Sequence, residues 1–224
     1  MDLLFHLVAA SLAFLVLHVL PSSPVRPMLV GMLGERAYSG LFSLVSAAGI
    51  VWMVIAYNGA GATPLWPGLK FLPVLLVPLA LVFIVAGVMS PNPTLVGQGR
   101  LLREADAAKG ILRITRHPVM WGILLWAAAH LLARATLEGI VFFGTFVVLA
   151  AAGTLLLDAR KAARYGEDWK RFAASTSNLP FLAIAQGRNR FALREIGFAK
   201  VAIGLAVSGG VFLFHGMLFG LRPF

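Results

Sequence analysis

Six long apolar stretches alternate with polar segments along the chain. Each has a length near the roughly 20 residues that a helix needs to cross the hydrocarbon core of a bilayer. Backbone exposed to lipid must satisfy its own hydrogen bonds, so these stretches are predicted to be helices. They span residues 3–20, 38–57, 72–89, 119–133, 137–157 and 201–221. The pattern therefore predicts an all-α, polytopic membrane bundle of six transmembrane helices that forms a single domain over residues 1–224.

The composition agrees with a membrane environment. Hydrophobic residues make up 59% of the chain and charged residues only 12%, which is too little polar surface to cover a soluble globule. Residues 3–20 lack the basic start and the small-residue cleavage site of a signal peptide, so we expect them to be a retained first helix. The sequence has no cysteine, which excludes disulfides and thiolate ligation of zinc or haem. Any metal or cofactor must therefore be held by histidine, carboxylate or methionine side chains.

Lysine and arginine residues gather in three alternate loops between the predicted helices. Sixteen of the 19 lie between helices one and two, three and four, and five and six. The positive-inside rule then places these basic loops in the cytoplasm and both termini outside. The net charge of +10 is thus explained by topology, and we expect the loops to meet anionic lipid headgroups and not nucleic acid.

The cytoplasmic segment 158–200 is expected to lie along the membrane interface. Its first part predicts a helix that leaves the membrane, followed by an amphipathic helix whose Trp169 and Phe172 face lipid. In the first basic loop, Glu35 and Arg36 begin the second helix. They are expected to form structural ion pairs with the basic residues that follow them.

The five histidines are predicted to form two layers. His18 ends the first helix and His117 begins the fourth, so both lie near the cytoplasmic surface. His130, roughly 18 Å further into the fourth helix, belongs with His6 and His215 in the outer half. Ionisable residues inside a membrane are energetically expensive and usually face the bundle interior for a functional reason. His18, His117 and His130 are therefore candidate site residues, whereas a structural role is expected for the two histidines near helix ends.

The motif Arg116-His117-Pro118 has its own physical argument. Proline suits the first position of a helix, because the N–H that it lacks would be unpaired there. His117 is then the N-cap residue, beside the positive end of the helix dipole, which disfavours the imidazolium form. A neutral imidazole can ligate a metal or accept a proton. The alternative is that the motif only anchors the helix at the headgroups, which Arg116 alone could do.

Several motifs spread over the chain carry a resemblance to a known family. They are His18 with residues 33–38 and 43–46, then 110–122, 129–131, 165–167 and 176–181. Together they resemble the NnrU family of bacterial membrane proteins over essentially the whole chain. The resemblance implies a multi-pass protein of the bacterial inner membrane.

The resemblance implies two different roles. NnrU proteins are linked with denitrification, which would make this chain an accessory factor for nitrite or nitric oxide reductase. The family also includes the zeta-carotene isomerases, haem b membrane enzymes that flip a central cis double bond, which implies a hydrophobic substrate such as a carotenoid. The haem-binding histidines of those enzymes match His18 and His130 here. An alternative cysteine ligand of the isomerase falls on Ala127 in this sequence.

The two matched histidines are predicted to lie at different depths. Counting residues separates His18 from His130 by on the order of 15 Å along the membrane normal. Two axial ligands of one haem iron must lie at a similar depth. Either the first helix runs further inward before Pro21, or the partner of His18 is His117.

Two further functions are implied by weaker patterns. Arg-His-Pro followed by a glycine and a later acidic residue is similar to isoprenylcysteine carboxyl-type membrane methyltransferases, which implies that His117 contacts S-adenosylmethionine and that Asp158 replaces the second residue of a Glu-Glu pair. Leu157 and Met120 depart from that pattern and argue against methyl transfer, although the fold can be shared without the chemistry. The third function is a non-enzymatic membrane partner of a respiratory complex, with close helix contact at residues 216–220.

Overall fold

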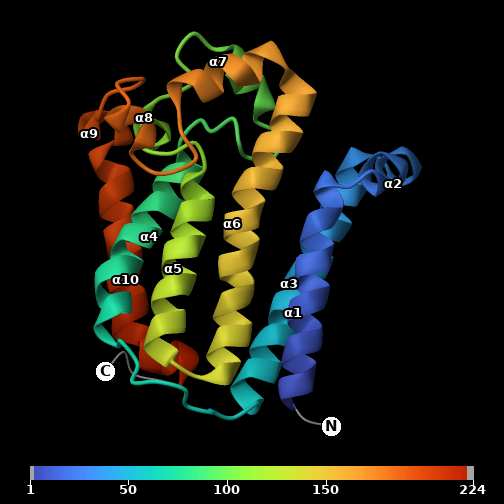
Figure 1. The fold of residues 1–224 in the computed structure, drawn as a ribbon, viewed down its shortest axis with the longest axis vertical. Coiled ribbons are helices and arrows are strands. Elements are labelled where there is room, and N and C mark those ends of the chain that lie inside the picture. Colours follow the sequence, from blue (N-terminus) through green and yellow to red (C-terminus); the bar gives the residue numbers. More distant parts are fainter. Residues whose placement is uncertain (1–2, 221–224) are drawn as a thin grey trace.

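The computed structural model describes residues 3–220 and is built from helices (Figure 1). Six of the helices are long and apolar. They are α1 (Leu3–Val19), α3 (Glu35–Gly59), α4 (Phe71–Met89), α5 (Pro118–Arg134), α6 (Leu137–Tyr165) and α10 (Phe198–Phe219). They coincide with the six predicted stretches to within a few residues, except that α6 continues eight residues beyond its predicted end. Between residues 3 and 220 the structure contains no β-strand, which confirms the all-α class.

Five of these helices are long and apolar enough to cross a membrane, and α5 is shorter. With 17 residues, α5 is roughly 25 Å long at the usual helical rise. It packs between α4 and α6 for most of its length (Figure 1). The contact with α4 is close, because a Cβ added at Gly122 would lie 2.6 Å from the carbonyl oxygen of Ala80. Small residues of this kind allow membrane helices to approach one another where no hydrophobic effect drives them together.

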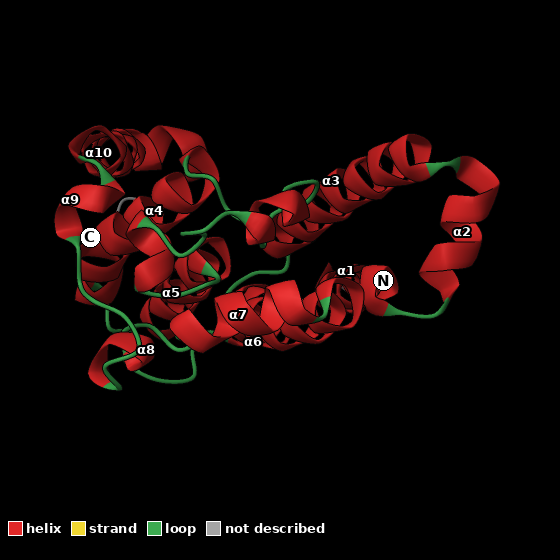
Figure 2. Cartoon of the chain, turned by 90° about the horizontal axis from the view of Figure 1, so that it is seen from above, coloured by secondary structure: helices red, strands yellow, loops and turns green. Residues whose placement is uncertain are grey.

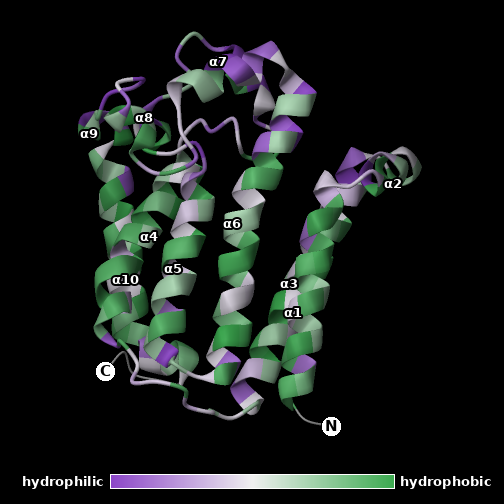
Figure 3. Cartoon of the chain, viewed as in Figure 1, coloured by the Kyte–Doolittle hydropathy of each residue, from purple (hydrophilic) through white to green (hydrophobic). Residues whose placement is uncertain are grey.

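The basic loops gather at one end of the bundle, which we call the basic end. Figure 3 shows hydrophilic residues concentrated there and in the short connections at the opposite end, with apolar helix between them. The short elements of the basic end are η1 (Leu20–Ser22), α2 (Val25–Leu33), η2 (Gly99–Arg103), η3 (Gly110–Arg113), α7 (Glu167–Ser175), α8 (Leu182–Ala185) and α9 (Leu193–Ile196). Helix α1 begins and α10 ends at the opposite end of the bundle. That the basic end faces the cytoplasm stays a prediction.

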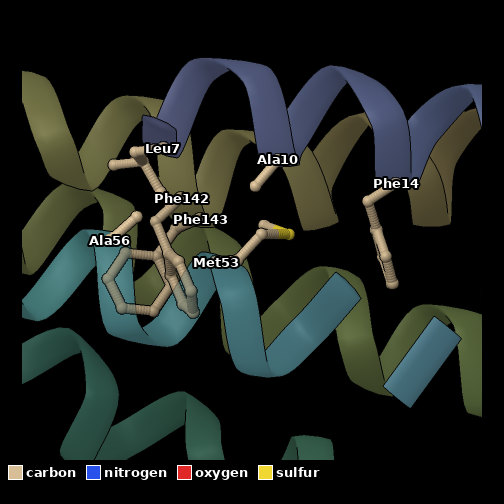
Figure 4. Close-up of a cluster of buried hydrophobic side chains, with 7 residues drawn as sticks. All are labelled: Leu7, Ala10, Phe14, Met53, Ala56, Phe142 and Phe143. Carbon is tan, nitrogen blue, oxygen red and sulfur yellow. The ribbon is translucent and has the colours of Figure 1, made fainter. Parts of the chain in front are cut away.

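Helices α1 and α3 form an antiparallel pair that packs on α6. Figure 2 shows α2 bridging the ends of this pair away from the other helices. The contact with α6 is a buried cluster drawn in Figure 4. Its members are Leu7, Ala10 and Phe14 of α1, Met53 and Ala56 of α3, and Phe142 and Phe143 of α6. Apolar packing therefore joins the first helical pair to the rest of the bundle.

One ion pair differs from the sequence-based expectation. Glu35, at the start of α3, pairs with Arg26 of α2, a basic residue that precedes it and does not follow it. The reason is that α2 bridges the end of α1 and the start of α3, and the Arg26 side chain reaches Glu35 in the first turn of α3. The Glu35 side chain is 56% exposed, and pairs so exposed contribute at most about 1 kcal/mol to stability.

The amphipathic helix α7 is packed against protein, so the prediction that its aromatic residues face lipid was wrong. Trp169 and Phe172 are only 4% and 3% exposed. They pack on Leu102 and Leu112, which come from the polar stretch between α4 and α5. That stretch folds beneath α7 as the short helices η2 and η3, and it supplies the apolar surface that lipid was expected to supply.

Candidate functional site

A charged cluster joins the start of α5 to α6. The Arg116 guanidinium donates from Nε to Asp158 Oδ1 at 2.9 Å and from Nη2 to Asp158 Oδ2 at 2.6 Å. His117 Nε2 lies 2.6 Å from the same Oδ1 atom, and its side chain is completely buried. Pro118 is the first residue of α5 and His117 is its N-cap, as the sequence predicted. The imidazole makes no capping hydrogen bond, however, because it turns toward Asp158.

The protonation state of His117 follows from this environment. Burial lowers its pKa from the ordinary 6.5, and the hydrogen bond to Asp158 opposes that effect without reversing it. The positive charges of Arg116 and Lys161 lower the pKa further. The imidazole is therefore neutral and donates its Nε2–H to the carboxylate. Its Nδ1 atom is buried and has no hydrogen-bond partner.

The polar turn that follows α7 wraps around the same motif. The Arg116 amide donates to the Ser177 carbonyl at 2.9 Å. Thr115 Oγ1 donates to the Asn178 carbonyl at 2.6 Å, and Trp121 Nε1 donates to that oxygen at 2.8 Å. The motif is thus bonded on one side to α6 and on the other to this turn, which makes it a joint that fixes α5 in place.

The geometry also bears on methyl transfer and haem ligation, the two functions that the sequence suggested for this motif. His117 and Asp158, the two residues that the methyltransferase resemblance selects, lie together, but His117 is bonded to Asp158 and Asp158 is also bonded to Arg116. Asp158 holds the Nε2–H of His117, and the free Nδ1 atom lies on a completely buried side chain, so His117 presents no open nitrogen to a haem iron. The cluster has the arrangement of a structural joint.

His18 and His130 share a different arrangement, which suits metal ligation. Each Nδ1 lies 2.8 Å from the carbonyl oxygen of the residue four positions earlier, Phe14 for His18 and Trp126 for His130. These bonds fix the proton on Nδ1 and leave the Nε2 lone pair available. Histidines that bind metals usually carry just such a hydrogen bond on the other ring nitrogen, because it orients the ring. Each histidine by itself therefore fits the chemistry of a haem ligand.

The two histidines do not meet, however. Three aromatic rings lie between them, and the centroid distances along the series are 4.2 Å for His18–Phe14, 5.8 Å for Phe14–Phe146, 5.4 Å for Phe146–Trp126 and 5.3 Å for Trp126–His130. We call this series the aromatic seam. One haem iron binds its two axial nitrogens on opposite faces of one ring, so this arrangement does not fit ligation of a single haem by both histidines. Helix α1 runs no further than Val19, so it does not carry His18 further inward.

Sequence reasoning missed the surroundings of His18 at the basic end. Its ring makes an edge contact with Phe42 at 5.3 Å, and Phe42 stacks on Tyr38 at 6.4 Å. The Arg26 guanidinium lies 5.4 Å from the centre of the Tyr38 ring. Arg160 of α6 approaches from the other side and donates to the Pro21 carbonyl of η1 at 3.3 Å. We call His18, Arg26, Tyr38, Phe42 and Arg160 the His18 corner. The signal in the sequence was that both arginines come just after the ends of apolar stretches.

Comparison with known proteins identifies the family. The family model described as NnrU protein matches residues 6–223. The chain belongs to the NnrU family. This NnrU chain is also similar to two proteins named 15-cis-zeta-carotene isomerase, chloroplastic. The one from Arabidopsis thaliana is 39% identical over 88 residues, which is 35% of this chain and 22% of that protein. The one from Zea mays is 37% identical over 90 residues, 36% of this chain and 22% of that protein.

The similarity to the isomerases is local. The aligned part of this NnrU chain spans about a fifth of the length of either relative. No solved structure matches the chain.

Proposed function

We propose that this NnrU-family protein is a membrane-embedded cis–trans isomerase of a polyene, and that it binds haem b through His18. The polyene class is supported by the similarity to two proteins named as isomerases of 15-cis-zeta-carotene. The apolar bundle supports it independently, because a carotenoid dissolves in the hydrocarbon phase in which these helices lie.

The observation that carries the haem proposal is the state of the His18 imidazole. Its Nδ1–H is held by the Phe14 carbonyl and its Nε2 lone pair is free, on a side chain that is only partly buried. Histidine nitrogen is a common axial ligand of haem iron. His130 has the same free lone pair, but it lies among aromatic rings at the other end of the aromatic seam. We assign the iron to His18 because the His18 corner also holds two arginines and the phenol of Tyr38, and these are the partners that the polar edge of a haem requires.

The other aromatic residues of the aromatic seam would bind the polyene. Isomerisation of a double bond transfers no atom and no net charge to the protein, so the chain must hold the polyene and exclude water. The aromatic rings of Phe14, Trp126 and Phe146 offer apolar faces on which a conjugated chain can stack. Haem, when bound, would supply the redox and coordination chemistry of iron, which these side chains lack.

The haem proposal is tested by spectroscopy of the protein purified in detergent from haem-replete cells. We expect a b-type reduced-minus-oxidised spectrum that is lost in His18→Ala. His6→Ala, on the same helix, is the matched control and should retain the spectrum, as should His130→Ala. A wild-type protein without a chromophore would contradict the haem proposal. Loss of the spectrum in His130→Ala with retention in His18→Ala would move the iron to His130.

The isomerase proposal is tested separately. Wild-type protein in liposomes that contain a 15-cis polyene should convert the polyene to the trans form. The conversion is measured by chromatography of the extracted polyene. His18→Ala should abolish the conversion and His6→Ala should preserve it. The isomerase proposal would be wrong if haem-loaded wild-type protein left the cis polyene unchanged both with oxidised and with reduced haem iron.

A further inference from the structure

The His18 corner brings together two arginine side chains, of which Arg26 pairs with Glu35 and Arg160 has a backbone carbonyl as its hydrogen-bond partner. Arg160 donates to the carbonyl of Pro21, and among residues 3–220 it forms no ion pair. It lies near enough to Arg26 and Arg164 for their charges to repel it. Two like charges that are partly shielded from water disfavour each other, and an anion between them would reverse the effect.

Tyr38 adds an unpaired polar group to this corner. Its side chain is 7% exposed, and its hydroxyl is buried with no hydrogen-bond partner. Leaving a buried hydroxyl unpaired destabilises the folded state, so native structures rarely contain one without a reason such as a bound ligand. The ring also lies under the Arg26 guanidinium, which places the hydroxyl and the cation at one location.

These groups lie on the side of His18 that faces the polar boundary. Ring contacts lead from His18 through Phe42 to Tyr38, while Arg160 approaches from α6. The existing partner of Arg26 is Glu35, a carboxylate 56% exposed to solvent. A pair so exposed contributes little to stability, so a ligand carboxylate held in the corner can compete for Arg26.

We propose that Arg26, Arg160 and Tyr38 bind the acidic groups of an amphipathic ligand whose apolar body contacts His18. The inference rests on the proposed function, since with haem bound to His18 these groups are the two propionate carboxylates. A guanidinium binds a carboxylate through paired, charge-assisted hydrogen bonds, and a phenol donates one more. The phosphate of an anionic lipid has the same chemistry, and the experiment separates the two sources.

The test compares haem with its dimethyl ester, which keeps the iron but masks both carboxylates. Each is titrated into haem-free protein in detergent and followed by absorbance. We expect the wild type to bind haem at least tenfold more tightly than the ester. Arg160→Gln and Arg26→Gln should each weaken haem binding about tenfold, and Tyr38→Phe about threefold, with ester binding unchanged. Arg36→Gln, an exposed neighbour of Glu35, is the control and should change neither affinity.

Each other outcome has a distinct meaning. Equal affinity of the wild type for haem and ester overturns the acidic-group site but leaves haem binding by His18 intact. Equal weakening of haem and ester by Arg160→Gln also overturns it, because it reveals a structural role. A wild type that binds neither contradicts the proposed function as well.

A final arm identifies the source of the acidic group. Haem titrations are repeated with added phosphatidylglycerol or phosphatidylcholine. We expect neither lipid to change haem affinity in the wild type. Weaker haem binding with phosphatidylglycerol alone would show that lipid phosphate is the occupant and would overturn the assignment to carboxylates.

Discussion

His117 Nε2 lies 2.6 Å from Asp158 Oδ1, although the two residues are 41 positions apart in the chain. The same carboxylate also binds Arg116 through both of its oxygens. One acidic side chain therefore balances a cation and orients a neutral imidazole, and it fixes the start of α5 on α6. Since α5 carries His130 and α6 carries Phe146 and Arg160, this joint sets the position of groups at both ends of the aromatic seam.

Removing the charge of Asp158 is expected to destabilise the protein. Asp158→Asn keeps the shape but leaves the Arg116 guanidinium, 15% exposed, without its counter-charge. Breaking one partner of a buried pair costs about 3–5 kcal/mol, and partial exposure here reduces the expectation to about 2–4 kcal/mol. The measurement is the thermal unfolding midpoint in detergent. Asp168→Asn is the control, because its arginine partners are 83% and 65% exposed. Equal midpoint losses in the two variants would contradict a joint at Asp158.

The same cluster predicts a dependence of stability on pH. Burial lowers the pKa of His117 below the 6.5 of an unfolded histidine, so the folded state prefers the neutral ring. The contribution of His117 to folding stability is complete above pH 6.5 and is lost as the pH falls toward the lowered pKa of this residue. Asp158, Arg116 and Lys161 are the charged groups that face the ring.

The pH prediction is measured as the unfolding midpoint between pH 7.5 and 5. The wild type should lose stability across this range, whereas His117→Gln should be less stable at pH 7.5 but change less with pH. His6→Gln should follow the wild type. An unchanged slope in His117→Gln would assign the acid sensitivity to other groups.

The sequence predicted the long helices well because a membrane helix is specified locally. The length of each apolar stretch, and Pro118 at the first position of α5, fix boundaries without knowledge of any contact. The nine-residue α2 was missed, because a window long enough to detect a transmembrane helix averages over so short an element.

The contacts that build the sites could not be predicted in the same way. The burial of Trp169 and Phe172 depends on a segment about sixty residues earlier, and an amphipathic pattern is equally suited to lipid and to protein. Arg160 lies near His18 only because α6 packs on α1 and η1, and Tyr38 lies there because α3 begins beside the end of α1. The family resemblance selected His18 and His130 as residues, but it carried no information on the rings that separate them.

At the opposite end of the bundle, Glu138 is expected to hold the loop between α3 and α4. Its carboxylate is 2% exposed and accepts hydrogen bonds of 2.9 Å from both the amide and the hydroxyl of Thr63. Glu138→Gln presents an amide N–H₂ to one of these donors. It should lower the free energy of unfolding by about 1–3 kcal/mol. Limited proteolysis within residues 60–70 should become faster. Glu167→Gln, 84% exposed, should leave the cleavage rate unchanged, and equal rates in all three proteins would refute this role.

Helix α10 offers a matched pair of glycines for testing its contact with α4. A Cβ at Gly204 would lie 2.8 Å from Val82 Cα, whereas a Cβ at Gly209 would meet nothing within 4 Å. Gly204→Ala should therefore push the helices apart and lower the free energy of unfolding by about 1–3 kcal/mol, as overpacking of a tight contact does. Gly209→Ala should be neutral or stabilise by up to about 1 kcal/mol, since alanine favours helix more than glycine does. Thermal midpoints in detergent would measure both, and a larger loss at Gly209 than at Gly204 would show that α10 packs on α4 through another face.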